Sequence, residues 1–312
     1  MKSAFIFPGQ GSQTIGMGKY FFDNFAEAKH VFEEVDQALS QKLSHIIFEG
    51  PEELLTLTEN TQPALMTCSI AILRVIEKIS GKNINDLCQF VAGHSLGEFT
   101  ALAATNALDI TTTAKLLKLR GQAMQAAVPQ NKGAMFALLG ANIDVAKDIA
   151  SSISKQNHIC EVANNNSEQQ QVLSGTVEGI DLAIKLAQEK GFKAIKLKVS
   201  APFHCSLMKP AQIKLTQALE TITVSDPLVP IIANVDANIE STSQIKQNLI
   251  KQTTSTVLWH ESMQKLKELN VTNVLEIGPG NVYTNLCKRI DKTFNAMALN
   301  TIENINQFIS TT

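Results

Sequence analysis

The N-terminal part of the chain alternates short apolar runs with longer stretches of helical periodicity. Residues 4–7 and residues 90–92 are apolar runs that each end in a turn. Apolar side chains recur at helical spacing over residues 26–39, 63–79 and 113–127. We expect Thr61 to cap the second of these helices and a further helix to begin at Leu96. Alternating strands and helices are typical of an α/β protein with a mainly parallel sheet.

The rhythm changes at Gly133. The pattern predicts, in order, a strand (134–139), a helix (144–154), two strands (161–164 and 171–174), a helix (179–190) and a strand (193–199). This βαββαβ order is the ferredoxin-like unit, so we expect a small inserted domain over residues 132–199. The α/β core then comprises residues 1–131 and 200–312, and resumes with a helix after Pro210, strands near Ile231 and Val274, and a closing helix.

Composition excludes several classes of protein. The chain has 27 Lys+Arg against 29 Asp+Glu and a formal net charge of -2, which argues against a nucleic-acid binder, since such domains are usually clearly basic. No apolar run approaches the roughly 20 residues of a membrane span, so we expect no membrane partner. The five cysteines are an odd number without C-x-x-C spacing, which favours reduced thiols. The apolar stretch before Pro8 is too short for a signal-peptide core, and we expect a cytoplasmic enzyme.

Residues 93–97 fit the G-x-S-x-G pattern of a nucleophile elbow. Small residues at both flanks let the backbone turn sharply and expose the hydroxyl of Ser95. An apolar strand precedes the pattern and a helical pattern follows it, which favours a nucleophile over an ordinary turn serine. The backbone N–H of Leu96, directly after the serine, is then a candidate donor to an oxyanion.

A serine nucleophile needs a base, usually histidine. His204 stands in a Pro-containing loop just after the last strand predicted for the insert, where it could reach the core. The residues alone leave a catalytic base and a structural histidine equally open. His94, beside the serine, is expected to support the elbow, and His30 is expected at the surface.

Arg120 is one of only three arginines in the chain, with Arg74 and Arg289. It lies in the middle of the apolar arc of the helix predicted over residues 113–127. A guanidinium facing a core is costly unless it meets an anion. Three interpretations remain open: an internal ion pair, a side chain that extends outward to solvent, and a fork for a substrate carboxylate.

Other motifs narrow the chemistry further. The turn at residues 9–13 does not fit G-x-G-x-x-G, because Thr14 stands where the last glycine is needed, and it does not fit a P-loop. Such a turn can instead aim backbone N–H groups at an oxyanion. No H-E-x-x-H spacing appears, so we expect no metal. A basic cluster in the insert is either a solvated face or a docking surface for an acidic partner; it contains Lys185, Lys190, Lys193, Lys196 and Lys198.

Several motifs together resemble one family. They are residues 7–13 (Phe-Pro-Gly-Gln-Gly-Ser-Gln), 61–65 (Thr-Gln-Pro-Ala-Leu), 93–98 (Gly-His-Ser-Leu-Gly-Glu), 120–121 (Arg-Gly), 202–204 (Pro-Phe-His) and 276–280 (Glu-Ile-Gly-Pro-Gly). Their types and order are similar to those of the malonyl-CoA:acyl-carrier-protein transacylases of type II fatty-acid synthesis, from residue 5 to about residue 290. The resemblance implies an α/β-hydrolase-like core with a parallel sheet and an inserted ferredoxin-like domain.

The resemblance also implies roles for individual residues. Ser95 matches the acylated nucleophile, His204 the general base, and Arg120 the arginine that holds the malonyl carboxylate. The backbone N–H groups of Gln10 and Leu96 match the oxyanion donors. In this family a main-chain carbonyl, in place of a triad carboxylate, orients the histidine.

The histidine-orienting carbonyl maps near Leu258. The chain departs from the family there, because Thr256-Val257-Leu258 replaces Pro-Val followed by Gln or Arg. It also has Phe99 in place of a common tyrosine, and Ser-Glu-Gln at residues 167–169 in place of Ser-Pro-Gly. A backbone role at Leu258 survives these changes.

The implied reaction is ping-pong transfer of a malonyl group from malonyl-CoA to the phosphopantetheine thiol of acyl carrier protein. The protein needs no cofactor of its own for this, and we expect a monomer. An extender-unit acyltransferase of polyketide assembly is a close alternative, although Phe203 before His204 favours malonyl. A serine esterase or thioesterase, and a silent module that only binds the carrier, are further alternatives.

Overall fold

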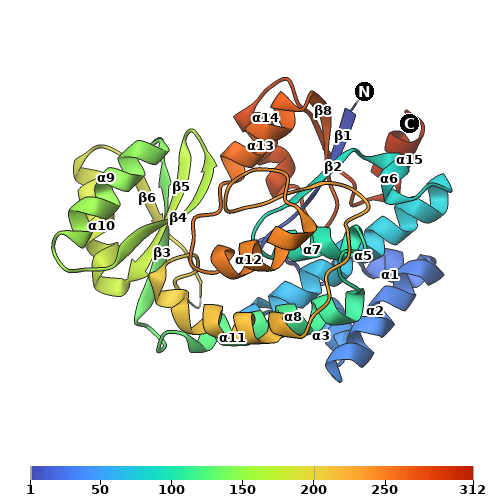
Figure 1. Ribbon diagram of the computed structural model, residues 1–312, viewed down its shortest axis with the longest axis horizontal. Coiled ribbons are helices and arrows are strands. Elements are labelled where there is room, and N and C mark those ends of the chain that lie inside the picture. The colour runs from blue at the N-terminus through green and yellow to red at the C-terminus, as the bar shows by residue number, and fades with distance from the viewer. Residues whose placement is uncertain (1, 200, 312) are drawn as a thin grey trace.

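The computed structural model describes residues 2–199 and 201–311 and contains two separate sheets (Figure 1). The first sheet has the strand order β7-β2-β1-β8-β9, and each neighbouring pair is parallel. Its strands are β1 (Lys2–Phe7), β2 (Phe90–Gly93), β7 (Ile231–Ile232), β8 (Val271–Glu276) and β9 (Asn295–Ala298). The predicted α/β class with a parallel sheet is confirmed. β9 was not predicted, because its Asn-Ala-Met-Ala sequence contains no β-branched or aromatic residue.

Helices surround the parallel sheet. They are α1 (Lys19–Asn24), α2 (Ala26–Leu39), α3 (Leu43–Glu49), α4 (Glu52–Thr56), α5 (Thr58–Ser80), α6 (Ile84–Leu87), α7 (Leu96–Ala104), α8 (Ile110–Ala126), the 3-10 helix η1 (Ser206–Met208), α11 (Lys209–Glu220), α12 (Thr242–Gln252), α13 (Trp259–Glu268), α14 (Val282–Ile290) and α15 (Ile302–Ile309). No helix among the described residues is long and apolar enough to cross a membrane.

Side chains of β1 alternate between two hydrophobic cores. Phe5 and Phe7 pack with α2, α5, α7, α8 and α15, whereas Ala4 and Ile6 pack with α13 and α14 on the other face. This alternation follows from the two-residue period of a strand that is buried on both faces. The result is a three-layer α/β/α core. The two ends of the chain meet in it, since the rings of Phe5 in β1 and Phe308 in α15 lie 5.9 Å apart.

The second sheet belongs to the predicted insert. It contains β3 (Gly133–Leu139), β4 (Cys160–Ser167), β5 (Gln170–Thr176) and β6 (Lys193–Lys196), with α9 (Ile143–Ser154) and α10 (Val177–Glu189) on one face. The strand order is β4-β5-β3-β6 and every pair is antiparallel. The elements follow in the predicted βαββαβ order, and a separate apolar cluster of their side chains lies between sheet and helices. β6 ends three residues before the predicted end of its strand. The predicted boundary at residue 200 lies outside the described residues, and the division into two domains stays a prediction.

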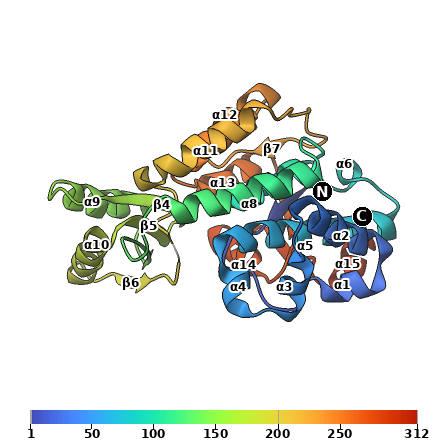
Figure 2. The same cartoon turned by 90° about the horizontal axis from the view of Figure 1, so that it is seen from below.

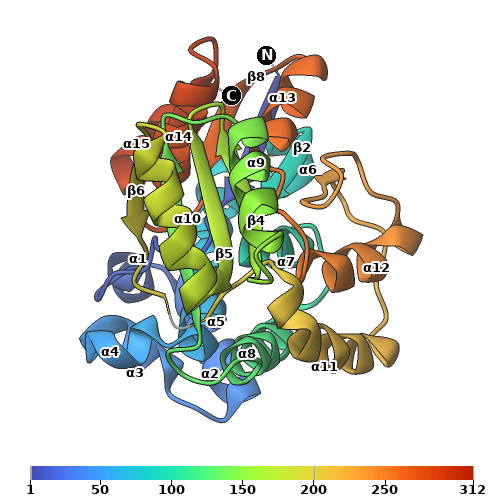
Figure 3. The ribbon, with the colours of Figure 1, turned by 90° about the vertical axis from the view of Figure 1, so that its left-hand side faces the viewer.

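The insert is joined to the core along β4. Val257 donates its N–H to Ala163 O (2.9 Å), and Asn165 donates its N–H to Val257 O (2.9 Å). The Thr256 hydroxyl also donates to Val162 O at 2.6 Å. Figure 3, which looks onto the insert, shows β4 on the side that faces α12 and α13. The segment between these two helices is therefore fixed to the insert by backbone hydrogen bonds.

The helix predicted to begin at Pro63 begins five residues earlier, and the predicted cap at Thr61 is wrong. α5 starts at Thr58, and the N–H groups of Asn60 and Thr61 already donate to Leu57 O at 2.8 Å. The Thr61 hydroxyl donates instead to Leu55 O (2.6 Å) and Leu57 O (3.1 Å). Pro63 is tolerated near the start of the helix because it removes only one N–H donor there.

A backbone contact between α5 and α8 places Arg120. α8 lies between α5 and α11 (Figure 2). A Cβ atom on Gly121 would lie 2.5 Å from Glu59 Cα and 2.7 Å from Thr58 O. Only glycine allows the first turn of α5 to come this close to α8. The preceding residue, Arg120, is thereby brought next to Gln62.

We expect Gly121→Ala to lower the melting temperature, because the added methyl group would force α8 away from α5. Overpacking of this kind typically costs about 1–3 kcal/mol. Thermal unfolding followed by circular dichroism measures the effect. Gln122→Ala, at the next residue and on the exposed face, is the matched control and should leave the melting temperature unchanged. Equal melting temperatures for the two variants would contradict the close contact.

Candidate active site

Ser95 occupies a strained turn between β2 and α7. Its backbone angles are φ 55° and ψ -106°, a conformation that residues other than glycine rarely adopt. The flanking glycines have no room for a side chain: a Cβ on Gly97 would lie 2.3 Å from Phe7 O, and one on Gly93 would lie 1.9 Å from the Gly97 backbone. The G-x-S-x-G pattern therefore forms the strand-turn-helix predicted for a nucleophile elbow.

The pairing of β1 with β2 brings the turn after β1 beside Ser95. Phe7 and Gly93 are register partners at the carboxyl ends of these strands, and His94 donates its N–H to Phe7 O (3.1 Å). The Gln13 side chain closes the turn by accepting the N–H of Gly11 at 2.7 Å. Gln10, in the same turn, lines the same pocket as Ser95.

The backbone N–H groups of Gln10 and Leu96 are free to donate. Within residues 2–199 and 201–311, neither has a hydrogen-bond acceptor in the protein. Leu96 is the first residue of α7, where N–H groups have no partner inside the helix. Both residues line the pocket beside Ser95. Their predicted role as oxyanion donors stays a prediction.

His204 contacts the hydroxyl of Ser95. Its Nε2 lies 2.8 Å from Ser95 Oγ, and its Nδ1 lies 2.8 Å from the backbone carbonyl oxygen of Gln252. Because a carbonyl only accepts, Nδ1 carries the proton and Nε2 is left to accept the serine proton. His204 itself has φ 58°, so the loop holds the ring with a second strained residue.

The prediction that the carbonyl of Leu258 orients the histidine is wrong. Leu258 precedes the first turn of α13, and its carbonyl oxygen accepts the N–H and the hydroxyl of Ser262 at 2.9 and 2.8 Å. Gln252 is the last residue of α12, where carbonyl groups have no partner within the helix. Apart from His204, Gln252 O accepts only a long hydrogen bond from the Ser255 N–H (3.4 Å), whereas Leu258 O already accepts two short ones from Ser262.

Burial keeps His204 neutral. The ring is 5% exposed, and burial, followed by the nearby positive charge of Arg120, lowers the pKa of His204 to about 3. Both effects disfavour the imidazolium form. At neutral pH the ring is therefore an unprotonated acceptor for the Ser95 hydroxyl, which is the state that a general base requires.

Arg120 faces the pocket, as the interpretation of Arg120 as a fork for a substrate carboxylate required. Its Nη1 donates to Gln62 Oε1 at 2.8 Å, and its Nη2 donates to Gln252 Oε1 at 2.8 Å and to Ser95 Oγ at 3.0 Å. The guanidinium carbon also lies 5.3 Å from the centre of the Phe99 ring. Its hydrogen-bond acceptors are thus uncharged side chains.

The two other interpretations of Arg120 do not fit. The side chain is 1% exposed, so it does not extend to solvent. Among the described residues it makes no ion pair with a carboxylate. Burial lowers the pKa of Arg120 to about 10, although the charge of Glu98 opposes this. The guanidinium is therefore charged at neutral pH, and among the described residues no carboxylate contacts it directly.

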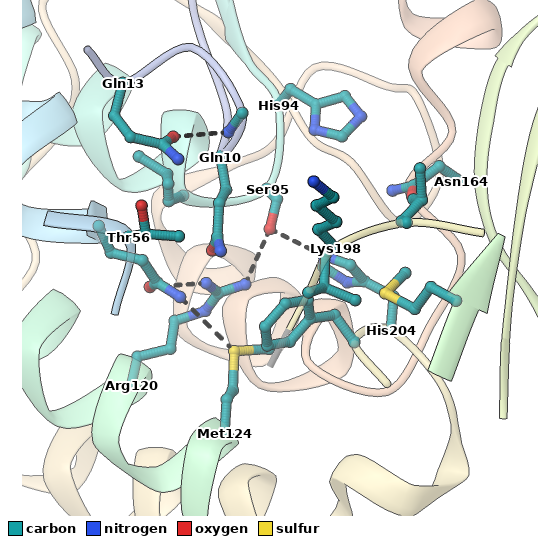
Figure 4. Close-up of a pocket in the computed structure, with 17 residues that line it drawn as sticks. Gln10, Gln13, Thr56, His94, Ser95, Arg120, Met124, Asn164, Lys198 and His204 are labelled. Atoms are coloured by element: carbon teal, nitrogen blue, oxygen red, sulfur yellow. Dashed lines mark hydrogen bonds between the residues drawn. The ribbon is translucent and has the colours of Figure 1, made fainter. Parts of the chain in front are cut away.

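These groups meet in a pocket of about 300 Å³. Figure 4 shows the side chains of Ser95, Arg120 and His204 directed toward one another within it. Apolar side chains line part of the wall, namely Met124, Met135, Leu197, Val199 and Phe203. Lys198 of the basic cluster also lines it, at the end of the insert. The pocket therefore offers a small acyl site with one cation at its floor.

Sequence reasoning missed three side chains that hold the site. Gln62 and Gln252 bind Arg120, and Asn234 accepts the Ser95 N–H through Oδ1 (2.7 Å) and donates through Nδ2 to Gly93 O (2.7 Å). Gln62 lies inside one of the matched motifs and could have been suspected. Gln252 and Asn234 have no local signal, because each is far from Ser95 along the chain.

The remaining residues that the sequence singled out are His94, His30 and the five cysteines. His94 is buried and also lines the pocket; its Nε2 lies 3.1 Å from Asn166 Oδ1 and its ring packs on Trp259 and Tyr283. Burial lowers the pKa of His94 to about 4. His30 is exposed, as predicted. All five cysteines are free and buried. Among the described residues no group of His, Cys, Asp and Glu could hold a metal ion.

Comparisons with known proteins identify the family of the chain. Residues 4–304 match the family model for the acyl transferase domain. The malonyl CoA-acyl carrier protein transacylase of Bacillus subtilis strain 168 is 44% identical, over 99% of this chain and 97% of its own length. The protein of the same name from Escherichia coli K12 is 38% identical, over 95% of each chain.

Solved structures lead to the same family. The acyl-carrier-protein-S-malonyltransferase of Bartonella henselae superposes with a TM-score of 0.97 at 45% identity, covering 100% of this chain and 99% of that one. A malonyl-transacylase in complex with its type II polyketide acyl-carrier protein superposes with a TM-score of 0.95 at 37% identity, covering 100% of both chains. The chain therefore belongs to the malonyl CoA-acyl carrier protein transacylase family of acyl transferases.

Proposed function

We propose that the protein transfers a malonyl group from malonyl-CoA to acyl carrier protein for fatty-acid biosynthesis. The observation that carries this proposal is the buried guanidinium of Arg120, which is held by uncharged side chains and has its Nη2 only 3.0 Å from the Ser95 hydroxyl. A malonyl group is short enough for its carboxylate to reach the guanidinium while its thioester carbonyl lies at the serine. The names of the curated relatives support the same substrate and carrier.

In the first half-reaction, Ser95 Oγ attacks the thioester carbonyl of malonyl-CoA, and His204 Nε2 takes the hydroxyl proton. The negative oxygen that forms is held by the N–H groups of Gln10 and Leu96, each worth about 3 kcal/mol by analogy with other oxyanion holes. The carbon–sulfur bond then breaks. His204 returns the proton to the sulfur, so CoA leaves as a thiol and a malonyl ester remains on Ser95.

The second half-reaction runs in the reverse sense. The phosphopantetheine thiol of the carrier gives its proton to His204, and its sulfur attacks the malonyl ester. The carbon–oxygen bond breaks, and His204 returns the proton to Ser95 Oγ. The carbonyl of Gln252 stabilises the transient imidazolium, in the place that a carboxylate takes in a Ser-His-Asp triad.

Arg120 gives the reaction its selectivity in this proposal. A carboxylate that binds the guanidinium forms charge-assisted hydrogen bonds in a low-dielectric pocket. The same contact fixes the carbonyl at the nucleophile. An acetyl group has no carboxylate and gains neither effect. A serine esterase would have no use for this cation, which is why the pocket favours transfer of a carboxylated acyl group.

The carrier remains open to a second candidate. One solved relative is a malonyl-transacylase in complex with a type II polyketide carrier protein, and it covers this chain completely. A carrier protein of polyketide assembly is therefore an alternative acceptor for the same chemistry.

We further propose a cytoplasmic monomer without a cofactor of its own, and five free, buried cysteines support a reducing compartment.

Intact-mass analysis after mixing with malonyl-CoA tests the proposal. We expect a single malonyl adduct on Ser95 that disappears when acyl carrier protein with its phosphopantetheine arm is added, as the carrier gains the same mass. Ser95→Ala is the control and should remain unmodified. An unmodified wild-type chain, or rapid release of free malonate without transfer to a carrier, would overturn the proposed function.

Arg120→Ala should reduce the preference for malonyl-CoA over acetyl-CoA. We expect the ratio of the two kcat/KM values to fall roughly 10- to 100-fold, because hydrogen bonds to a charged group are worth about 1.5–3 kcal/mol. Arg74→Ala removes an arginine that pairs with Glu77 on α5 and should not change the ratio. An unchanged ratio in Arg120→Ala would remove Arg120 from the proposed role.

A further inference from the structure

A buried carboxyl group lies beneath the catalytic residues. Glu98, on the first turn of α7, is 0% exposed. Its Oε2 accepts the Nε2–H of Gln252 at 2.8 Å and the backbone N–H of Asn234 at 3.1 Å. The backbone N–H of Glu98 donates to Ser95 O at 3.0 Å. The Glu98 side chain does not line the pocket, and its hydrogen bonds to Gln252 and Asn234 connect it to the site.

Gln252 connects Glu98 to Arg120 and Ser95. Its Nε2 donates to Glu98 and to Ser95 O (3.0 Å), while its Oε1 accepts from Arg120 Nη2. The two ends of a carboxamide are chemically different, and a reversed amide would turn N–H groups toward the guanidinium. Because a carboxyl oxygen accepts hydrogen bonds, Glu98 holds the NH₂ end on its side and leaves the oxygen for Arg120.

Asn234 connects Glu98 to the nucleophile turn. Its N–H is held by Glu98, and its side chain bonds both the N–H of Ser95 and the carbonyl of Gly93. The strained backbone of Ser95 is therefore fixed on one side by the residue that Glu98 anchors. A single carboxyl oxygen thus supports both the anion-binding arginine and the elbow.

The spacing also explains how Arg120 stays available. Glu98 and Arg120 are separated by the Gln252 carboxamide, so the carboxyl group is near the cation without occupying its N–H groups. Burial raises the pKa of Glu98, and the charge of a second buried carboxyl group, Glu240, also raises it. Two such groups do not both ionise readily. The acceptor geometry of Glu98, rather than its charge, is therefore the feature to test.

We propose that Glu98 is a positioning residue for malonyl transfer, whose Oε2 fixes the Gln252 carboxamide and thereby aims Arg120 at the acyl site. This inference rests on the proposed function. It predicts that the preference for malonyl-CoA over acetyl-CoA depends on the length of the side chain at residue 98 and not on its negative charge.

Two variants separate reach from charge. Glu98→Gln keeps the length of the side chain and an acceptor oxygen but removes the charge, whereas Glu98→Asp keeps the charge and withdraws the carboxyl group by one methylene. We expect the malonyl-to-acetyl ratio of kcat/KM to stay within about threefold of wild type in Glu98→Gln. In Glu98→Asp we expect it to fall roughly tenfold, mainly through the KM for malonyl-CoA, since a buried hydrogen bond is lost.

Glu276→Asp is the matched control, because it withdraws another buried carboxyl group by one methylene. Glu276 is also 0% exposed, and it accepts the N–H and hydroxyl of Thr284 at 2.7 Å, away from Arg120. We expect this variant to lose thermal stability but to keep the wild-type malonyl-to-acetyl ratio. Rates are normalised to the fraction of enzyme that forms the malonyl ester, so that misfolded protein does not enter the comparison.

The outcomes are distinguishable. A wild-type ratio in Glu98→Asp, or a loss in Glu98→Gln as large as that in Glu98→Asp, would overturn the positioning role. A loss of the ratio in Glu276→Asp equal to that in Glu98→Asp would overturn it as well, because withdrawing any buried carboxyl group would then have the same effect. Failure of wild-type enzyme to form the malonyl ester would instead refute the proposed function itself.

Discussion

One buried positive charge organises this site. The guanidinium of Arg120 is held by the side-chain oxygens of Gln62 and Gln252 and by the Ser95 hydroxyl, all of them uncharged. These hydrogen bonds engage Nη1 and Nη2, whereas the buried Nε has no partner among the described residues. They do not cancel the charge, and a buried charge that no carboxylate contacts is costly. An anionic acyl group lowers that cost when it binds, whereas a neutral one does not. Selectivity for a carboxylated substrate follows from this difference in the proposed mechanism.

The fold fixes the positions of the other site residues, beginning at the carboxyl ends of two parallel strands. β1 and β2 end side by side, so the turn that carries Gln10 lies next to the strained elbow of Ser95. The close contact of α5 with α8 sets the position of Arg120, and the end of α12 supplies the carbonyl that orients His204. Gln252 belongs to both arrangements, because its backbone binds the histidine and its side chain binds the arginine.

Local patterns in the sequence predicted the parts of the site that depend on local structure. The elbow at Ser95 and the inward face of Arg120 follow from glycine spacing and helical periodicity, and the order of strands and helices follows from hydrophobic runs. Gln252 and Asn234 could not be predicted in this way, because they lie 157 and 139 residues from Ser95 and meet it only in the folded chain. The error at Leu258 has the same origin, since whether a carbonyl is free depends on where the helices end. The start of α5 was misplaced because Pro63 is tolerated inside its second turn.

A crystal structure of the protein after reaction with malonyl-CoA tests the central claim most directly. The account predicts a malonyl ester on Ser95 Oγ whose carboxylate lies about 2.7–2.9 Å from the Arg120 guanidinium nitrogens, the distance of a charge-assisted hydrogen bond. It also predicts that the ester carbonyl oxygen lies within hydrogen-bond distance of the N–H groups of Gln10 and Leu96. A carboxylate directed to solvent or to Lys198, with Arg120 bound only to Gln62 and Gln252, would contradict the account.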